Sequence, residues 1–250
     1  GQGDAAVLRH GRQAVLVDVG KANGKETIRY LRHEGLYVDT VVLSHLDEDH
    51  AGALKELMDS EIQISRIVLP AGLEESEACD TVRAGLDAAH EAGVNIIKTG
   101  AGEKIEALGI QMDVLAPGEW KKKEDNDYSL VLYVEIENAA LLLTGDSPTT
   151  SEQYAIPVCD VLKVSHHGSP YATSDAFIHQ AEPQIALISV GRNSYGHPAQ
   201  RVIDSLEENG AYVVRTDEGG CITLWLGKRK MALQTYCASS LKPVILAYTR

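Results

Sequence analysis

The sequence predicts an α/β fold in which two mixed β-sheets pack together and carry helices on their outer faces. Short apolar runs typical of strands alternate along the chain with segments of helical spacing. Roughly a dozen strands are expected, which is too many for one simple open sheet, and two packed sheets covered by helices would bury them. The 250 residues are 44% hydrophobic and 24% charged, which is ordinary globular usage and excludes a disordered or collagen-like chain.

The first half of the chain is expected to begin with a hairpin and then to alternate helices with strands. A polar turn at residues 10–13 separates two apolar runs, which predicts the hairpin. The first helix is expected near Lys25, because Ile28 and Leu31 share one side and Gly35 can end it. The expected strands are 5–8, 14–19, 38–44, 64–70, 94–98, 104–107 and 110–116. The expected helices are 25–34, 53–58 and 74–92, the last ending before Gly93.

The second half repeats this order loosely after a polar loop at residues 118–127. A strand pair forms around the Glu137-Asn138 turn, and single strands then alternate with short helices. The expected strands are 130–135, 140–144, 161–165, 185–190, 213–216, 222–225 and 231–235. The expected helices are 151–154, 174–180 and 199–209. No linker separates the halves, so we expect one domain over residues 1–250, cut from a longer protein.

Charge narrows the classes of function. The formal net charge is −13, and a protein that grips nucleic acid by charge alone usually carries a basic face. The two short basic runs, 121–123 and 228–230, are expected to be solvated turns. An acidic protein can still handle phosphates if bound cations supply the positive field. No apolar run approaches the roughly 18 residues of a membrane span.

A chemically unusual turn follows the strand expected at 38–44. It reads Ser-His-Leu-Asp-Glu-Asp-His-Ala-Gly over residues 44–52. His45, Asp47 and Asp49 recur at a spacing of two, and His50 adds a second imidazole. Imidazole and carboxylate together are a ligand set for first-row transition metals. The alternative, a solvent-exposed acidic turn, is disfavoured by the two histidines.

Three later segments carry related chemistry. The strand at 140–144 leads into Gly145 and Asp146, where a glycine lets a ligand approach the carboxylate, although Gly-Asp is also an ordinary turn. The strand at 161–165 leads into the adjacent His166 and His167, which are uncommon in an inert loop. The turn at 191–198 gathers amide, phenol, guanidinium and imidazole groups that suit a phosphate, or that simply cap the next helix.

These strings resemble one superfamily, the metallo-β-lactamases. Its signature is His-x-His-x-Asp-His, after an apolar strand that ends in Asp-x-Gly. Residues 18–20 match the strand end, and residues 45–50 match the signature, with Asp47 where the second histidine usually stands. With the strings at 128–132, 144–146, 165–169 and 195–198, nearly the whole chain is similar to the soluble domain of the ComEC family of DNA-uptake channels. This resemblance implies a four-layer αβ/βα sandwich.

The resemblance also implies roles for single residues. Two divalent metal ions would be held by His45, Asp47, Asp49, His50 and His166, with Asp146 shared between them. His166 is preferred to His167 as the ligand. His167 would then be a phosphate contact or a proton donor, and His197 another proton donor, beside the catalytic Asp146. Asp18 would support the signature turn from behind, and Asp4 would line the cleft. The expected substrate contacts are Ser169, Asn193, Tyr195 and Asn126.

Two departures from the family pattern bear on the metal. Asp47 replaces a histidine, and no histidine lies between His90 and His166, where the family at large supplies one. Asn126, Asp127, Ser129 or a water molecule could face that position. The ligand set therefore shifts toward oxygen, which favours Mn²⁺ over Zn²⁺.

The resemblance implies a nuclease that degrades the DNA strand that is not imported during natural transformation. The partners would be single-stranded DNA and a transmembrane channel domain of the same protein, with the domain membrane-associated on the extracytoplasmic side and no dinucleotide cofactor. One alternative is a phosphodiesterase of the same fold that acts on phosphorylcholine esters. Others are a zinc hydrolase of thioesters or lactams, and a metal-free module that only binds DNA or a channel partner.

Overall fold

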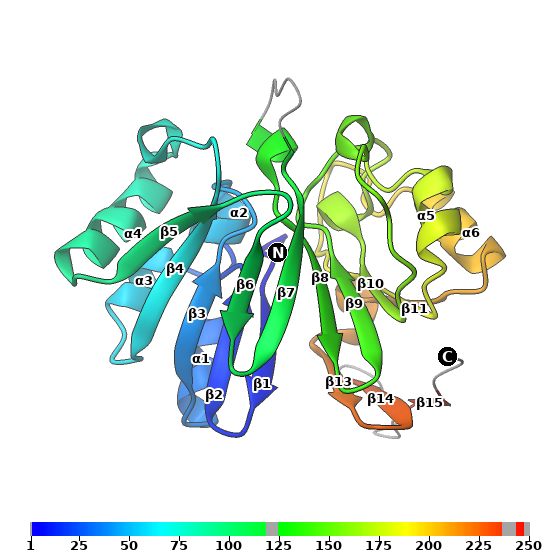
Figure 1. The fold of residues 1–250 in the computed structure, drawn as a ribbon, viewed down its shortest axis with the longest axis horizontal. Coiled ribbons are helices and arrows are strands. Elements are labelled where there is room, and N and C mark those ends of the chain that lie inside the picture. Colours follow the sequence, from blue (N-terminus) through cyan, green and yellow to red (C-terminus); the bar gives the residue numbers. More distant parts are fainter. Residues whose placement is uncertain (1, 119–124, 237–243, 248–250) are drawn as a thin grey trace. The chain divides into compact units, whose positions relative to one another are not determined.

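A computed structural model describes residues 2–118, 125–236 and 244–247 of the chain. The chain divides into two compact units, Gln2–Leu130 and Val131–Arg250. Each unit has its own strands and helices (Figure 1). The single domain expected over residues 1–250 therefore stays a prediction. The basic run at 121–123 lies outside the described residues.

The first unit is built on a mostly parallel sheet. The hairpin expected at its start is present, and its two strands pair in an antiparallel manner across the turn at Gly11. Strands β2 to β5 then run parallel to one another. In sheet order the strands are β1 (Ala6–His10), β2 (Gln13–Val17), β3 (Tyr37–Val42), β4 (Ile64–Pro70) and β5 (Asn95–Thr99). A second hairpin joins β6 (Lys104–Ala107) to β7 (Ile110–Ala116).

Helices of the first unit bury one face of this sheet. The helices are α1 (Glu26–His33), α2 (Glu48–Ala51), α3 (Leu54–Met58) and α4 (Asp80–Glu91), with single 3₁₀ turns η1 (Glu75–Glu77) and η2 (Asp125–Tyr128). Leu31 of α1 and Leu86 of α4 share a buried cluster with Leu16 and Val41 of the sheet. Burying each such side chain contributes about 1.5–3 kcal/mol, so this packing fixes the strand ends that carry the polar residues.

Two expectations for the first unit need correction. The helix expected at 74–92 begins only at Asp80, because the backbone is extended at Ala78 and Cys79, which brings Ala78 into the core. The signature turn, expected as a loop, contains the one-turn helix α2. It has only four residues, two of which are carboxylates, so the sequence shows no apolar periodicity there.

The second unit repeats the design. Its main sheet pairs β8 (Val131–Ile136) with β9 (Ala139–Leu143) in an antiparallel manner, and continues in parallel through β10 (Val161–Lys163), β11 (Ile185–Ile188) and β12 (Tyr212–Arg215). A small antiparallel sheet contains β13 (Ile222–Leu226), β14 (Lys230–Thr235) and β15 (Val244–Ala247). The basic run at 228–230 is exposed at the turn between β13 and β14, as expected.

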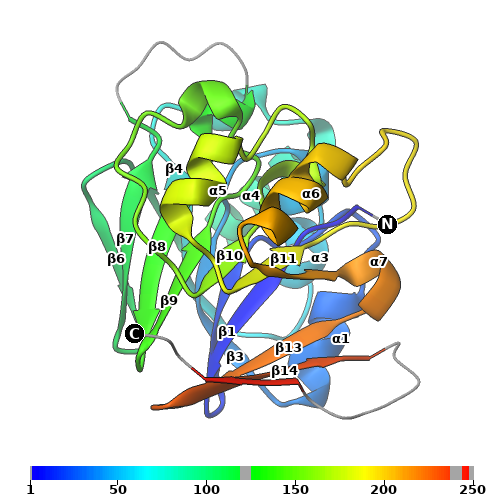
Figure 2. The same cartoon turned by 90° about the vertical axis from the view of Figure 1, so that its right-hand side faces the viewer.

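Helices α5 and α6 lie side by side across strands of the second unit (Figure 2). The helices of this unit are α5 (Asp175–Ala181), α6 (Gln200–Glu208) and α7 (Thr216–Gly219), with 3₁₀ turns η3 (Thr149–Ser151) and η4 (Ser165–Gly168). The helix expected at 151–154 is wrong. The chain leaves helical geometry at Glu152, whose carboxylate instead accepts hydrogen bonds from Ser174 at the start of α5. No helix in the described ranges is long and apolar enough to span a membrane.

In both units the residues of chemical interest follow the carboxyl ends of parallel strands. Asp18 and His45 follow β2 and β3 in the first unit. Asp146 and His166 follow β9 and β10 in the second, and the 191–198 loop follows β11. Ligands of open α/β sheets characteristically bind at this edge. Each unit therefore carries a candidate half-site, and the two are described in turn.

Candidate metal centre

The first half-site is the signature turn, and main-chain hydrogen bonds fix it against the sheet. Asp18 adopts a left-handed conformation (φ 63°) directly after β2, and its N–H donates to the carbonyl of Val42 at 2.8 Å. The N–H groups of Val19 and Gly20 both donate to the carbonyl of His50, at 2.8 and 3.1 Å. The two strand ends and α2 are thereby held together, and the side chains of the turn start from fixed positions.

A chain of hydrogen bonds determines which ring nitrogen carries the proton in both signature histidines. The Asp18 carboxylate accepts the Ser44 N–H at 2.7 Å and the Ser44 hydroxyl at 2.8 Å. The Ser44 hydroxyl has one proton, which it donates to Asp18. In its 3.0 Å contact with His45 Nδ1 the hydroxyl oxygen is therefore the acceptor, and the imidazole N–H donates. His50 Nδ1 lies 2.8 Å from Asp18 Oδ2, the oxygen that also accepts the Ser44 hydroxyl, and it donates to that oxygen. Nε2 is therefore the lone-pair nitrogen on both rings, which is the tautomer a metal ligand needs.

The two imidazoles lie together and completely buried. Their ring centroids are 4.2 Å apart, and neither side chain is exposed to solvent. Asp47 is the amino-terminal cap of α2 and remains 42% exposed, with its Oδ2 3.6 Å from His45 Nε2. Asp49 is partly buried, and its carbonyl accepts the N–H of the buried Asp4 at 2.8 Å. The half-site thus offers two imidazole nitrogens beside carboxylates, one of which faces solvent.

The second half-site begins where β9 ends. Gly145 turns the chain with φ 51° and places Asp146 in the interior, where it is 2% exposed. The N–H of His166 donates to the Gly145 carbonyl at 3.1 Å, and the Thr144 hydroxyl donates to the Lys163 carbonyl at 2.6 Å. These bonds tie the carboxylate loop to the histidine loop within one unit.

The two adjacent histidines differ in burial and in anchoring. His167 is 2% exposed, and its Nδ1 lies 2.6 Å from the carbonyl of Ser189, which can only accept, so Nδ1 carries the proton and Nε2 the lone pair. The side chain of His166 is 32% exposed. The Nε2 atoms of His166 and His167 lie 3.7 and 4.0 Å from Asp146 Oδ2. Both residues adopt left-handed backbone conformations, with φ near 50°.

The donor atoms of both half-sites fit divalent cations. The nitrogen–oxygen separations of 3.6 Å at Asp47 and of 3.7 and 4.0 Å at Asp146 are too long for hydrogen bonds. Ligands at about 2.0–2.2 Å from a shared ion would be separated by somewhat less than these distances. Histidines that ligate metals almost always donate their other ring N–H to a carboxylate or carbonyl. His50 and His167 have this arrangement, and His45 reaches the Asp18 carboxylate through Ser44.

The 191–198 loop brings a third imidazole to the second half-site. The rings of His166 and His197 have centroids 5.6 Å apart. Burial, followed by the neighbouring His166 and His167, lowers the pKa of His197, whereas Asp146 opposes the shift. His197 is therefore neutral near pH 7 and can accept a proton. Tyr195 lies beside it, with ring centroids 5.8 Å apart and planes 31° from parallel.

The remaining expected substrate contacts lie in well-defined environments. Asn193 uses its amide within the loop, donating to the carbonyls of Gly191 and His197 and accepting from the N–H groups of Tyr195 and His197. Ser169 is buried, and its hydroxyl accepts the N–H of Tyr171 at 3.3 Å. Asn126 lies in η2 of the first unit and is partly buried. Their contacts with a substrate stay predictions.

Sequence reasoning missed two residues that orient the imidazoles, Ser44 and Ser189. Ser44 connects His45 to Asp18, and Ser189 supplies the carbonyl that holds His167. A signal existed for the first, because a Ser-His pair follows both β3 and β10. No side-chain signal exists for Ser189, since it acts through its main chain.

A family model identifies the superfamily to which this fold belongs. The family model "Metallo-beta-lactamase superfamily" matches residues 1–192, and the chain belongs to this superfamily, whose members are in general metal-dependent hydrolases. The predicted fold class is thereby confirmed. Among solved structures, the fold matches YhfI from Bacillus subtilis (TM-score 0.53, 12% identity, 85% of this chain and 88% of that one). It also matches Zn²⁺-bound PqqB from Methylobacterium extorquens (TM-score 0.54, 13% identity, 84% of each chain).

Three curated relatives sharpen the comparison. The chain is 34% identical to ComE operon protein 3 of Bacillus subtilis, over 89% of this chain and 31% of that protein. It is 27% identical to Recombination protein 2 of Haemophilus influenzae (94% and 29%) and 29% identical to Competence protein ComA of Neisseria gonorrhoeae (91% and 31%). The chain thus spans about a third of the length of these relatives. The resemblance to a competence-associated metallo-β-lactamase domain is confirmed.

Proposed function

We propose that the chain is a metal-dependent phosphodiesterase that cleaves DNA during natural transformation, degrading the strand that is not imported. The observation that carries this proposal is the pair of oriented imidazole–carboxylate half-sites at the carboxyl edges of two sheets. The relatives named for competence and recombination point to DNA as the substrate. Their greater length leaves room for a further domain, and we propose that this further domain is a transmembrane channel. A position of the present chain on the extracytoplasmic side would fit removal of the strand that is not imported.

The family resemblance supports the ligand set. We infer that His45, Asp47, Asp49 and His50 contribute to the same pair of divalent cations as Asp146 and one of the paired histidines. Bound in this way, the cations would activate water and neutralise charge on the phosphate. With Asp47 in place of a histidine, the set is rich in oxygen, which favours Mn²⁺ and leaves Zn²⁺ as the alternative.

The chain's own residues would orient the ligands and move the protons. Asp18 holds the Nδ1 proton of His50 directly and that of His45 through Ser44, which places the lone pair of each ring on Nε2. His197, neutral near pH 7, would take a proton from water at its lone-pair nitrogen and return it to the leaving oxygen. The exposed His166, 5.6 Å from His197, would contact the phosphate.

This assignment exchanges the roles that the sequence favoured for the paired histidines. His167 is buried and anchored through Nδ1, as a ligand should be, whereas His166 is a third exposed. Replacing each by glutamine distinguishes the two assignments. Under our assignment His167→Gln weakens Mn²⁺ binding measured by calorimetry, and His166→Gln lowers turnover while leaving Mn²⁺ binding intact. The reverse pattern would restore the sequence-based preference for His166.

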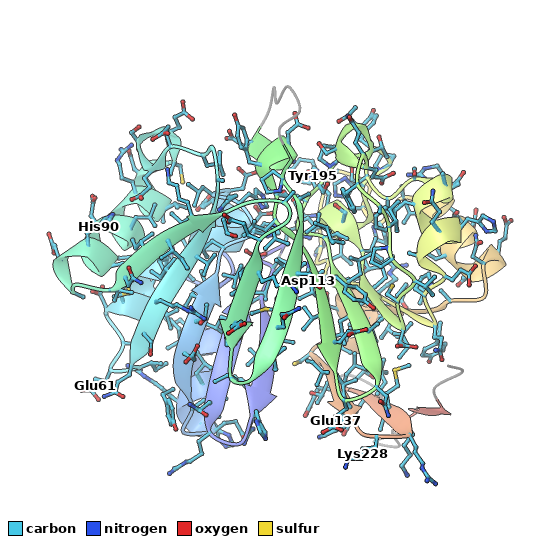
Figure 3. All side chains as sticks on the ribbon, in the orientation of Figure 1. Glu61, His90, Asp113, Glu137, Tyr195 and Lys228 are labelled. Carbon is cyan, nitrogen blue, oxygen red and sulfur yellow. The ribbon has the colours of Figure 1, made fainter. Side chains whose placement is uncertain are left out.

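The proposed function is tested by hydrolysis of single-stranded DNA with the purified chain, titrated with Mn²⁺, Zn²⁺ and Mg²⁺. We expect cleavage that depends on Mn²⁺ and is lost in Asp47→Ala. Glu61→Ala, which removes an exposed carboxylate elsewhere on the first unit (Figure 3), is the matched control and should cleave normally.

Parallel assays use a choline phosphodiester and a thioester. Cleavage of the choline ester alone would indicate the phosphorylcholine alternative, and thioester cleavage with Zn²⁺ would indicate the zinc hydrolase. A folded chain that binds DNA but hydrolyses no substrate with any metal would contradict the enzymatic proposal and support a binding module.

A further inference from the structure

The two most exposed aromatic side chains in the described part of the chain lie on loops of the second unit next to His166, His167 and His197. Tyr171 and Tyr195 are 78% and 73% exposed, whereas no other large apolar side chain in the described ranges exceeds the 56% of Tyr236. Tyr171 lies on the loop that follows η4, and Tyr195 on the loop that follows β11. Figure 3 shows Tyr195 at the end of this unit opposite the turns of Glu137 and Lys228.

The loop that carries Tyr195 is held rigidly although its tip is exposed. Asn193 accepts the N–H of Tyr195 at 3.0 Å and that of His197 at 3.1 Å, while its own amide donates to two loop carbonyls. The loop is also joined to the histidine loop, because the N–H of Ala199 donates to the Gly168 carbonyl at 2.8 Å. An aromatic ring on such a loop is presented to a ligand without a large cost in backbone ordering.

The orientation of the ring suits a flat ligand. The Tyr195 and His197 rings are within 31° of parallel, and His197 in turn lies 5.6 Å from His166. Most of the phenol ring remains open to solvent. A planar group lying on Tyr195 would therefore be placed next to the imidazoles on which the proposed hydrolysis depends.

The charge of the chain explains why such a surface would be needed. With a net charge of −13, the protein gains little from the phosphate–cation contacts that dominate most nucleic-acid affinity. Stacking on aromatic side chains is largely independent of protein charge and accepts any base, because every base has a π-face. Arg192 is exposed on the same loop and can meet a phosphate.

We propose that Tyr195 is the stacking platform for an unpaired nucleobase next to the phosphodiester that is cleaved. This inference rests on the proposed function and adds a reason for single-strand selectivity. Bases of a duplex are already stacked on their neighbours, so only an unpaired base can lie on the Tyr195 ring. The substrate class is therefore a single strand or a frayed end. Tyr195 would recognise the flat face of any unpaired base and would not select a particular sequence.

Steady-state kinetics with Mn²⁺ tests the inference on three substrates. These are a single-stranded oligonucleotide, an abasic oligonucleotide of the same length, and an abasic dinucleotide as a small diester without aromatic groups. Tyr195→Ala should raise KM for the first by about 5- to 150-fold, as loss of one stacked base predicts, and leave the other two nearly unchanged. Tyr195→Phe should retain oligonucleotide KM, because the ring and not the hydroxyl stacks.

The matched control is Tyr212→Ala. Tyr212 is 48% exposed in the same unit but begins β12, at the amino edge of the parallel strands. It should leave all three substrates unaffected.

A binding measurement without metal separates this inference from the proposed function. In EDTA, where no hydrolysis is expected, the fluorescence of Tyr195→Trp should be quenched by the oligonucleotide and much less by its abasic counterpart. If no diester is hydrolysed under any condition, the proposed function fails, while the quenching still decides the stacking.

Three results would overturn the stacking platform. One is an unchanged KM in Tyr195→Ala. Another is an equal loss on the oligonucleotide and the small diester, which would mean that Tyr195 acts only by positioning His197. The third is quenching by phosphorylcholine but not by the oligonucleotide, which would assign the ring to a quaternary ammonium group.

Discussion

In the first unit a buried carboxylate orients the candidate ligands, whereas in the second unit a main-chain carbonyl does so. Asp18 serves His50 directly and His45 through the Ser44 hydroxyl, so one side chain determines two tautomers. His167 depends on the carbonyl of Ser189. A single side-chain replacement can therefore dismantle the first arrangement, but only a displacement of the backbone can dismantle the second.

Backbone strain is distributed differently as well. In the first half-site the left-handed residues are Asp18 and Gly20, which are types that accept this conformation, and the histidines themselves lie in ordinary backbone. In the second, His166, His167 and Gly168 are left-handed in succession. Left-handed non-glycine residues cost on the order of 1–3 kcal/mol each where they are strained, and persist because the surroundings fix them. The first half-site is therefore built by side-chain hydrogen bonds and the second by loop packing.

The largest effect is expected at the carboxylate of the second half-site. Asp146→Asn keeps the shape of the side chain and removes its charge, so activity should fall by about a thousandfold, the upper end of the effect of a single electrostatic group. Circular dichroism and thermal unfolding should show an intact fold. Glu137→Gln, at an exposed turn of the same unit, is the control. Near-normal activity in Asp146→Asn would remove the carboxylate from the proposed centre.

The next effect tests the side-chain arrangement of the first half-site. Asp18→Asn tolerates the left-handed backbone, but its NH₂ group cannot accept the protons of Ser44 and His50. Loss of a group that orients a ligand typically lowers metal affinity about 10- to 100-fold, which calorimetric titration with Mn²⁺ would detect.

Asp160→Asn is the matched control for that experiment. Asp160 is equally buried in the second unit, where it accepts the N–H of Ala140 and the amide of Gln184, and contacts no candidate ligand in any described bond. Its replacement should lower the free energy of unfolding by about 1–3 kcal/mol and leave metal affinity unchanged. Equal metal affinities in the two variants would refute the orienting role of Asp18.

A smaller effect probes the loop packing of the second half-site. Gly168 has φ +77°, and a Cβ there would lie 2.6 Å from Pro198 Cβ. Alanine at positive φ costs about 1 kcal/mol by itself, and the contact with Pro198 adds to this cost, so Gly168→Ala should destabilise the protein by more than that amount. It should also displace His167. Gly210→Ala isolates the conformational part, because Gly210 has φ +84° with nothing within 4 Å of its added Cβ. Equal urea midpoints would show that the contact with Pro198 is unimportant.

The smallest effect is expected at Asn193. Asn193→Ala removes the hydrogen bonds that brace the 191–198 loop, and Asn193→Asp retains the acceptor oxygen for the N–H groups of Tyr195 and His197. We expect KM for the oligonucleotide to rise several-fold in Asn193→Ala, which corresponds to roughly 1 kcal/mol. In Asn193→Asp we expect KM to return part of the way to the wild-type value. If aspartate is worse than alanine, the two bonds donated by the amide matter more than those it accepts.

Much of the fold could be predicted because strands and helices repeat their periodicity over several residues. The strands at 64–70, 104–107 and 110–116 end where the sequence indicated, and α1, α5 and α6 lie within one or two residues of expectation. The short helix α2 was not predicted, because its four residues, two of them carboxylates, are too few to show an apolar period. The extended backbone at Ala78, which delays the start of α4, was not predicted either, because it depends on a core contact that the local sequence does not encode.

The candidate site divides in the same way. Its ligand types are visible in the sequence, because histidines and aspartates collect at strand ends. The tautomers are not visible, since they depend on the direction of the Ser44 hydroxyl and on the carbonyl of Ser189. His166 and His167 differ in burial, and the sequence does not show which of two adjacent histidines is the buried one.

The central claim is that both half-sites supply ligands to one pair of cations. Electron paramagnetic resonance of the purified chain loaded with two equivalents of Mn²⁺ tests it most directly. If one pair of cations is held by both half-sites, the spectrum should show exchange coupling, and Asp146→Asn should abolish the coupling. Two isolated Mn²⁺ signals in the wild-type protein, or a single ion that survives the loss of either half-site, would contradict the claim.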